Sequence, residues 1–441
     1  MLKIIQLVLL TALLIGSLAV RAATPHEYRL DNGLNILVLV DRRAPIVISQ
    51  IWYKVGSTYE HDGITGVSHA LEHMMFKGTQ TLAPGEFSEI IARHGGRENA
   101  FTGRNYTAYF QRIHRDNLEL CLRLEAERMR GLKLDARDWA KEKEVIKEER
   151  LNRTDDRPSG LTFERFYATA FATSPTRNPI IGWMHDIDAL TVADLRAWYD
   201  AWYAPNNATL VVAGDLDPEE VLRLARRHFG PLRARAIAQP KPRPELPQRG
   251  AKRLDMRIPA KVPYLVMGYK VPPLLLEEQA GDAYALELLA GILDRGESAR
   301  LQNALVRDTQ IAVSAGASYE LYDRLPTLLL LDATPAADKT LQSVEAALRA
   351  EVQRLRDQPV SEAELQRVKT QIIASDVYGR DSLFYQAMKI GIAETVGVGY
   401  ALQSQYLEGV RAVTPADIQR VAKKYLVDAR LTVATMEPDD A

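Results

Sequence analysis

Two stretches of the chain match each other and decide its architecture: LTVADLRAWYDAWYAPNNATLVVAGD, residues 190–215, and VTPADIQRVAKKYLVDARLTVATME, residues 413–437. Each has Thr at its second position and Ala-Asp two residues later, and each continues with an amphipathic helical pattern. Each then ends in a short apolar run that is typical of a β-strand. The same helix–strand unit therefore occurs twice, near the end of each half of the chain.

Two further matches occur in the same order. APIVISQIWYKV (44–55) and VPYLVMGYKV (262–271) are strand-like runs that both close on Tyr-Lys-Val. HALEHMM (69–75) and YALELLA (284–290) then begin 15 and 14 residues after the respective lysines. Three matched segments in one order indicate a duplication.

The matches predict the division of the chain. Residues 233–253 are rich in Pro, Arg and Lys and have no apolar periodicity, which predicts an extended linker. We therefore expect an N-terminal domain over 23–232 and a homologous C-terminal domain over 254–441. The fold class expected is α+β, with a mainly antiparallel sheet in each domain and helices packed on one face. Helical periodicity is found near 116–131, 136–153, 216–229, 338–357 and 361–378.

The N-terminus resembles an export signal. An apolar run from Ile4 to Val20 follows Lys3, and small residues stand at Ala22 and Ala23. This pattern predicts a signal peptide over residues 1–22 and a periplasmic or secreted protein. A retained membrane anchor is the alternative. Cys121 is the only cysteine, so no internal disulfide can form.

Composition excludes some partners. Hydrophobic residues make up 46% and charged residues 26%, as in an ordinary globular protein. The net charge is −1, and removal of Lys3 and Arg21 with the signal peptide makes it −3. Such a chain has no electrostatic basis for binding nucleic acid or for stable association with an anionic membrane.

The segment HALEHMM predicts a metal site. On a helix, His69 and His73 share one face and can hold one ion. Glu72 lies close enough to take a proton from a water molecule that the ion activates, and to pass it to a leaving amine. In the second copy Tyr284 and Leu288 occupy the histidine positions. The histidines are therefore interpreted as an addition for chemistry, not for packing.

A third ligand is expected on another helix, because a catalytic zinc site has three protein ligands. The segment 138–153 offers four glutamates, and Val145 and Ile146 are taken to mark its inward face. Glu142 and Glu149 are seven residues apart and lie on that side, whereas Glu144 and Glu148 alternate with lysines. Glu149 is predicted as the ligand, and Glu142 as a second carboxylate that positions a ligand or the water.

His69-x-x-Glu72-His73, with Glu149 at 76 residues after His73 and Glu142 seven before it, resembles the pitrilysin/insulinase family (M16) of zinc peptidases, the inverted zincins. The resemblance spans the mature chain and is to the short bacterial and processing-peptidase-like members. It implies one zinc ion held by His69, His73 and Glu149, with Glu72 as general base. Manganese or cobalt in place of zinc stays open.

The resemblance also implies how a substrate is held. HGGRENAFTGRNYTAYF (94–110) predicts a hairpin, and in the family this segment forms the edge strand beside the zinc. An extended peptide would add to it as a further strand, along Asn99, Ala100, Phe101 and Thr102. The alternative is that the hairpin has only a structural role.

One segment departs from the family pattern. Active members carry an arginine and a tyrosine in the second half that bind the substrate carbonyl. In LVRDTQIAVSAG (305–316), Arg307 is the candidate arginine, but Val313 stands at the tyrosine position and cannot donate a hydrogen bond. Tyr319 is the remaining candidate donor. The resemblance implies a second chain, either a related subunit without zinc that supplies the tyrosine or another copy of this chain.

The function predicted is a zinc-dependent endopeptidase that hydrolyses extended or unfolded peptides and needs a second related subunit for full activity. A subunit that keeps zinc but acts only in assembly or as a chaperone is one alternative, although such a subunit has no need of Glu72. A zinc hydrolase for a non-peptide substrate is another.

Overall fold

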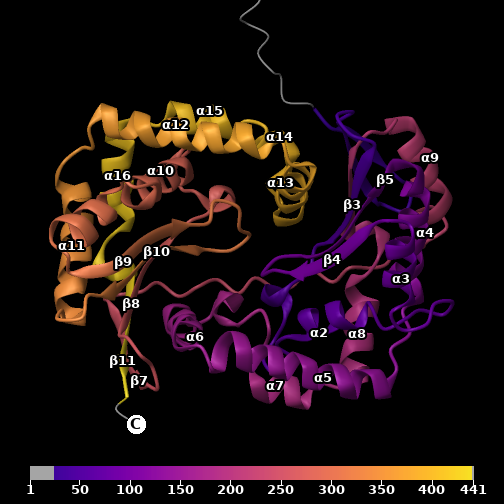
Figure 1. Ribbon diagram of the computed structural model, residues 1–441, viewed down its shortest axis with the longest axis horizontal. Helices are drawn as coiled ribbons and strands as arrows, with labels where there is room; N and C mark the ends of the chain where they lie inside the picture. The colour runs from indigo at the N-terminus through magenta and orange to yellow at the C-terminus, as the bar shows by residue number, and fades with distance from the viewer. Residues whose placement is uncertain (1–23, 440–441) are drawn as a thin grey trace, which may run out of the picture.

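The structure is a computed structural model that describes residues 24–439. The predicted signal peptide, residues 1–22, lies outside these residues. In the part of the chain that is described, no helix is both long enough and apolar enough to cross a membrane. The described chain forms two halves, each built around one β-sheet (Figure 1).

The first half contains a six-stranded sheet with the strand order β1-β2-β6-β3-β5-β4. Only the β2–β6 pair is parallel, and the other neighbours are antiparallel. The central strands β3 and β6 are almost wholly buried, whereas the edge strand β4 is partly exposed. The strands are β1 (His26–Arg29), β2 (Asn35–Val40), β3 (Ile46–Tyr53), β4 (Arg97–Thr102), β5 (Thr107–His114) and β6 (Ala208–Gly214).

Seven of the helices of the first half pack with this sheet around one apolar core. They are α2 (Val67–Met74), α3 (Glu86–Arg93), α4 (Leu118–Gly131), α5 (Ala136–Arg150), α7 (Met184–Ala189), α8 (Val192–Trp202) and α9 (Pro218–Phe229). A short π-helical segment, Leu151–Asp155, continues α5. Among the described helices of this half, α6 (Pro158–Ala170) lies outside this core.

The second half contains a five-stranded sheet with the order β7-β11-β8-β10-β9, in which only β7–β11 is parallel. Its strands are β7 (Lys252–Ile258), β8 (Tyr264–Val271), β9 (Ala312–Tyr319), β10 (Thr327–Pro335) and β11 (Leu431–Pro438). Its helices are α10 (Asp282–Asp294), α11 (Leu341–Asp357), α12 (Glu362–Gly379), α13 (Leu383–Val396), α14 (Gly399–Gln403), α15 (Tyr406–Ala412) and α16 (Pro415–Tyr425).

The two halves share one topology. Without β1, the first sheet reads β2-β6-β3-β5-β4, which corresponds strand for strand to β7-β11-β8-β10-β9. The matched segments also begin alike, because Thr191 with Asp194 and Thr414 with Asp417 form the same capping box at the starts of α8 and α16. The predicted α+β class with two homologous domains is confirmed.

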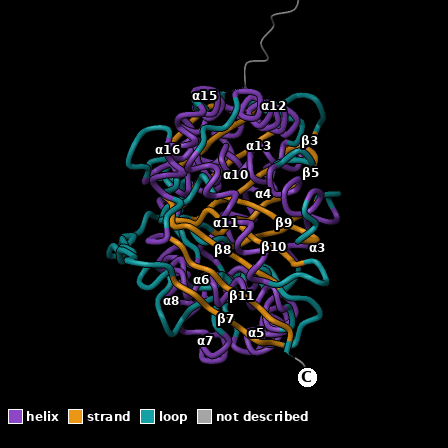
Figure 2. The backbone as a smooth tube through the Cα atoms, turned by 90° about the vertical axis from the view of Figure 1, so that its left-hand side faces the viewer, coloured by secondary structure: helices purple, strands orange, loops and turns teal. Residues whose placement is uncertain are grey.

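The halves exchange one helix each. Helix α6 of the first half packs on β7, β8 and β11, and α13 of the second half packs on β3 and β6 (Figures 1 and 2). Each sheet is therefore covered by its own helices on one face and by a borrowed helix on the other. The sequence did not predict this second layer. It explains why β3 and β8 are buried on both faces.

Glycines permit both close approaches. A Cβ at Gly391 of α13 would lie 2.0 Å from Cε2 of Trp52, which is fully buried in β3. A Cβ at Gly268 of β8 would lie 2.7 Å from Cζ of Phe166 in α6. Since such contacts are too short for any side chain, only glycine lets these helices reach the sheets.

The segment between the halves is extended, as predicted. Helix α9 ends at Phe229 and β7 begins at Lys252, so the last two residues of the predicted linker, 233–253, belong to β7. Glu245 fixes this segment to both halves. It accepts hydrogen bonds from the backbone N–H groups of residues 172, 173 and 174, and its Oε1 lies 2.6 Å from Nζ of Lys270 in β8.

Candidate metal centre and its edge strand

Helix α2 carries the first part of the site, and a tight turn sets where it begins. Gly66 precedes it with φ 85°, and a Cβ there would lie 2.4 Å from the carbonyl oxygen of Ile181. The fully buried Glu60 caps the helix, because its carboxylate accepts hydrogen bonds from the N–H groups of Gly66 (2.7 Å) and Ser68 (2.9 Å). Burial raises the pKa of Glu60 to about 7, although these bonds oppose the rise.

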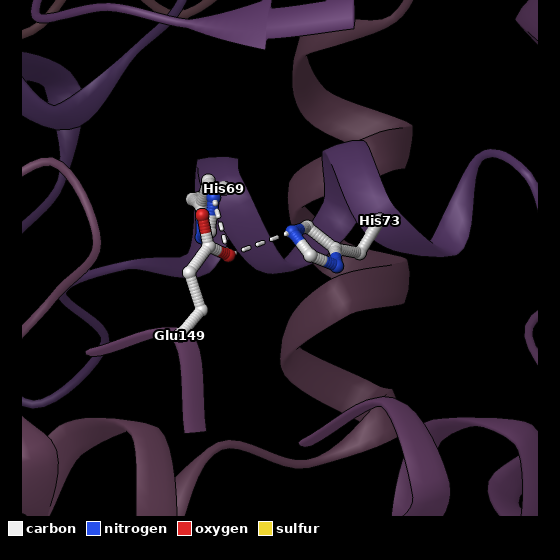
Figure 3. Close-up of side chains that lie close together, drawn as sticks. All are labelled: His69, His73 and Glu149. Atoms are coloured by element: carbon white, nitrogen blue, oxygen red, sulfur yellow. Dashed lines mark ion pairs between the residues drawn. The ribbon is translucent and has the colours of Figure 1, made fainter. Parts of the chain in front are cut away.

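The structure brings His69, His73 and Glu149 together (Figure 3). The Nε2 atoms of His69 and His73 lie 3.6 Å and 3.3 Å from the same atom, Oε2 of Glu149. The histidines come from successive turns of α2 and the glutamate from the last turn of α5. The three side chains thus converge from two helices on one point.

Glu142 lies behind His73. Its Oε1 is 2.9 Å from Nδ1 of His73, and its Oε2 is 2.6 Å from Nζ of Lys77. Burial opposes ionisation of Glu142, but the bonds with His73 and Lys77 outweigh it and lower its pKa. An ionised carboxylate can only accept, so Nδ1 of His73 is the donor. Of the two predicted alternatives, these contacts favour the positioning of a ligand over that of the water, because Glu142 bonds to His73, one of the three predicted ligands.

The electrostatics of the two histidines differ. Burial alone would lower the pKa of His73, but Glu142, Glu149 and Glu72 raise it to about 9. Burial lowers the pKa of His69 to about 4, and the neighbouring His73 adds to this. Among the described residues, Nδ1 of His69 is buried without a hydrogen-bond partner. The acidic surroundings of His73 and the shared focus of the Nε2 atoms favour a cation at this point.

The donor set fits a metal ion. Two imidazole nitrogens and one carboxylate oxygen are the ligands of several catalytic zinc sites, which leave one position open for water. In such sites a carboxylate often accepts a hydrogen bond from the second ring nitrogen of a ligating histidine and so fixes its tautomer and its direction. Glu142 makes this contact with His73.

Glu72 lies on α2, like the two histidines, and its side chain is hydrogen-bonded to a residue of the sheet. Oγ1 of Thr102, the last residue of β4, donates a hydrogen bond of 2.5 Å to Oε2 of Glu72. Burial raises the pKa of Glu72, and the bond from Thr102 partly offsets this. Thr102 was predicted to bind substrate through the main chain of its strand; its side chain contacts Glu72, a role that was not predicted.

The other predicted substrate-binding residues of the first half lie along the free edge strand β4. The side chain of Phe101 packs against Trp52, with ring centroids 5.3 Å apart, and Ala100 packs against the first core. Asn99 is exposed, and its Oδ1 accepts a hydrogen bond of 2.9 Å from the N–H of Ala100. Among the described strands none pairs with β4 on the side away from β5, so a peptide would meet mainly the backbone of this strand.

In the second half, the side chains predicted to bind the substrate carbonyl contact other groups of the same half. Arg307 pairs with Glu297 of its own half at 3.2 Å. The hydroxyl of Tyr319 donates to the carbonyl oxygen of Pro272 at 2.7 Å. Val313, which was predicted to stand at the tyrosine position, is 62% exposed.

One detail of helix α5 differs from the sequence-based expectation. Val145 was taken to mark the inward face of α5, but it is 51% exposed, whereas Ile146 is fully buried. The inward face is therefore centred on Ile146, with Glu142 four residues before it and Glu149 three after, and the choice of these glutamates does not depend on Val145. Glu144 and Glu148 are exposed, as expected.

The sequence reasoning also missed three partners of the site. Arg153 lies 2.7 Å from the second oxygen of Glu149, and Lys77 pairs with Glu142. Residues four apart on a helix are neighbours on its surface. Arg153 is four residues after Glu149, and Lys77 is four residues after His73, so this spacing could have indicated that both lie close to the site. The contact between Thr102 and Glu72 spans 30 residues, and no local pattern indicates it.

The chain is also similar to known proteins. Residues 36–183 match the family model "Insulinase (Peptidase family M16)", and residues 189–372 match "Peptidase M16 inactive domain". The chain is 31% identical over 422 residues to the zinc protease PqqE of Helicobacter pylori, covering 94% of this chain and 93% of that one. It is 28% identical over 412 residues to an uncharacterized zinc protease of Rickettsia bellii, covering 93% of this chain and 97% of that one.

Solved structures are similar as well. The crystal structure of a protease from Helicobacter pylori matches with a TM-score of 0.90 at 29% identity, over 94% of this chain and 100% of that one. A structure titled as a peptidase M16 inactive domain from Pseudomonas fluorescens matches with a TM-score of 0.84 over 95% of this chain and 98% of that one. Its 16% identity bears on the fold alone. From the level of identity and its coverage, the chain belongs to peptidase family M16, the insulinase family.

Proposed function

We propose that this chain is a zinc-dependent endopeptidase that hydrolyses extended or unfolded peptides. The observation that carries the proposal is the convergence of His69, His73 and Glu149 beside Glu72, next to a free edge strand. The names of the Helicobacter and Rickettsia relatives as zinc proteases support the choice of metal. One zinc ion per chain is proposed, because the described residues offer one such cluster.

Each residue has a defined part in the proposal. His69, His73 and Glu149 would hold the ion, and Glu142 would keep His73 in the tautomer that leaves Nε2 free to bind. When bound, zinc would supply a Lewis acid that activates water and polarises the carbonyl of the peptide bond. Glu72 would take the proton from the attacking water and deliver it to the leaving nitrogen. Thr102 would hold Glu72 toward the peptide on β4.

The proposal includes a second chain. Arg307 and Tyr319 are engaged within their own half, and Val313 cannot donate a hydrogen bond. Loss of one donor to a developing oxyanion reduces the rate by about 100- to 1000-fold. We therefore expect a related subunit to supply this donor, with a homodimer as the alternative. We also propose that residues 1–22 direct export to the periplasm or outside the cell.

The decisive experiment measures cleavage of a quenched fluorescent peptide by the purified mature chain, with zinc and with a chelator, alone and mixed with a related subunit. Cleavage that depends on zinc and is lost in Glu72→Gln supports the proposal. The amide keeps the shape of the side chain but cannot accept the proton. If Glu72→Gln stays within tenfold of the wild type, Glu72 is not the general base. A zinc-loaded chain that cleaves no peptide in either condition contradicts the proposed activity.

A further inference from the structure

The edge hairpin formed by β4 and β5 carries an unusual pair of charges. In the antiparallel register Arg97 of β4 lies directly opposite Arg112 of β5. Like charges in directly opposite positions destabilise a sheet, and an anionic group bound beside them would relieve this repulsion. Both side chains are exposed, and among the described residues neither forms an ion pair.

Helix α13 covers the neighbours of this pair on the same face of the sheet. On the same face, the pair next to it is Asn99 opposite Phe110, and the ring of Phe384 from α13 lies on Phe110, with centroids 4.7 Å apart. Asp381, just before α13, is bound to Arg43 at 2.9 Å. Helix α13 thus covers the central strands of this face and leaves the two arginines open.

Among the described residues, no comparable pair of like charges occurs on the other face of the hairpin or on the corresponding hairpin of the second half. On the other face of the hairpin, Glu98 is near the buried Arg128, which pairs with Glu125 at 2.6 Å. In the second half, the register of β9 with β10 brings no two like charges opposite each other. The uncompensated pair therefore occurs on the hairpin that borders the metal centre and not on its counterpart.

We propose that Arg97 and Arg112 select peptides that carry an aspartate or glutamate three to five residues from the cleaved bond. This inference rests on the proposed function, in which the peptide adds to β4. The cleaved bond lies near Thr102, which contacts Glu72, and Arg97 is five residues away along the strand. At ~3.4 Å per residue this is about 17 Å. A carboxylate at that point of the added strand lies beside Arg97, within reach of the long side chain of Arg112.

The test uses peptides that are identical except for one Glu, Gln or Lys, moved one position at a time away from the cleaved bond. We expect Glu to raise kcat/KM over Gln by about two- to fivefold at one or two of these positions, the range of an exposed ion pair. The preference should disappear in Arg97→Gln, and Arg97→Glu should prefer Lys. It should also weaken at 1 M salt, where the screening length is about 3 Å.

The matched control is Arg29→Glu, which makes the same charge change on β1, at the opposite edge of the same sheet. Peptide binding to the Glu72→Gln variant, followed by fluorescence anisotropy, gives a second readout without turnover. Equal values for Glu and Gln at every position overturn the inference and leave the proposed peptidase standing. An equal effect of Arg29→Glu also overturns it, because net charge is then responsible. Failure to cleave any peptide, whatever its charge, contradicts the proposed function instead.

Discussion

Replacement of Glu245 by glutamine should loosen the junction between the two halves. This carboxylate lies in the linker, accepts hydrogen bonds from three backbone N–H groups of the first half, and lies 2.6 Å from Nζ of Lys270 in the second. Glutamine removes the charge, and its NH₂ group would face donors that it cannot bond. A buried lysine would then lose its partner.

The magnitude follows from the pKa of Glu245. Burial raises it, but Lys270 and the three N–H groups outweigh burial and lower the pKa from 4.5 to about 2. At ~1.4 kcal/mol per pKa unit, this corresponds to about 3 kcal/mol of stability. The side chain is only 7% exposed, so solvent screening reduces this value little. Because the folded pKa is the lower one, the stabilisation is fully present above about pH 4.5 and is lost as the pH falls toward 2.

Urea unfolding followed by tryptophan fluorescence measures the effect. At pH 7 we expect Glu245→Gln to unfold at lower urea, with a loss of about 3 kcal/mol, and the difference from the wild type should shrink below about pH 4. Glu27→Gln, an exposed position on β1, is the control and should change little. A difference under about 0.5 kcal/mol at pH 7, or one that does not depend on pH, would refute the reasoning.

Four further predictions concern the site and the sheet. His73→Ala should lose most of the bound zinc while Glu148→Gln keeps it, measured by metal analysis after dialysis; retention in Glu149→Gln with loss in Glu148→Gln would reverse the ligand choice. Glu142→Gln should weaken zinc affinity by about 10- to 100-fold, as loss of a carboxylate behind a ligating imidazole does, and unchanged affinity in a chelator competition would remove its positioning role. Thr102→Val should lower kcat more than it changes KM, and Thr102→Ser should restore kcat; equal rates for both variants would contradict the bond to Glu72. Gly391→Ala should cost roughly 1–3 kcal/mol through its clash with Trp52, whereas Gly131→Ala, with 3.5 Å to its nearest neighbour, should not lower the unfolding midpoint.

Much of the fold could be predicted from local patterns. The helices expected near 116–131, 216–229, 338–357 and 361–378 correspond to α4, α9, α11 and α12, with ends that differ by at most three residues. Periodicity and caps operate within a few residues, so they are visible in one sequence. The duplication was visible because the two copies kept short identical segments, such as Tyr-Lys-Val, at matching places.

What could not be predicted depends on contacts between distant segments. The exchange of α6 and α13 brings Phe166 to Gly268 and Gly391 to Trp52, pairs that are 102 and 339 residues apart. No local pattern in either helix indicates which of the two sheets it packs on. The contact between Thr102 and Glu72 could not be predicted either. A threonine at the end of a strand is common, and only the fold brings this one next to Glu72.

The second half shows what the fold itself requires of the metal-bearing helix. At the histidine positions α10 has Tyr284, which is 7% exposed, and Leu288, which is fully buried, so an aromatic and an aliphatic side chain pack where the imidazoles stand in α2. Glu287, the counterpart of Glu72, accepts a hydrogen bond of 2.7 Å from the hydroxyl of Tyr406, and burial raises its pKa to about 7. The helix that corresponds to α2 in the second half thus packs with no imidazole at these two positions. This supports the interpretation that His69 and His73 serve chemistry and not packing, and mutation of the acidic groups around them, as predicted above, tests whether they share that role.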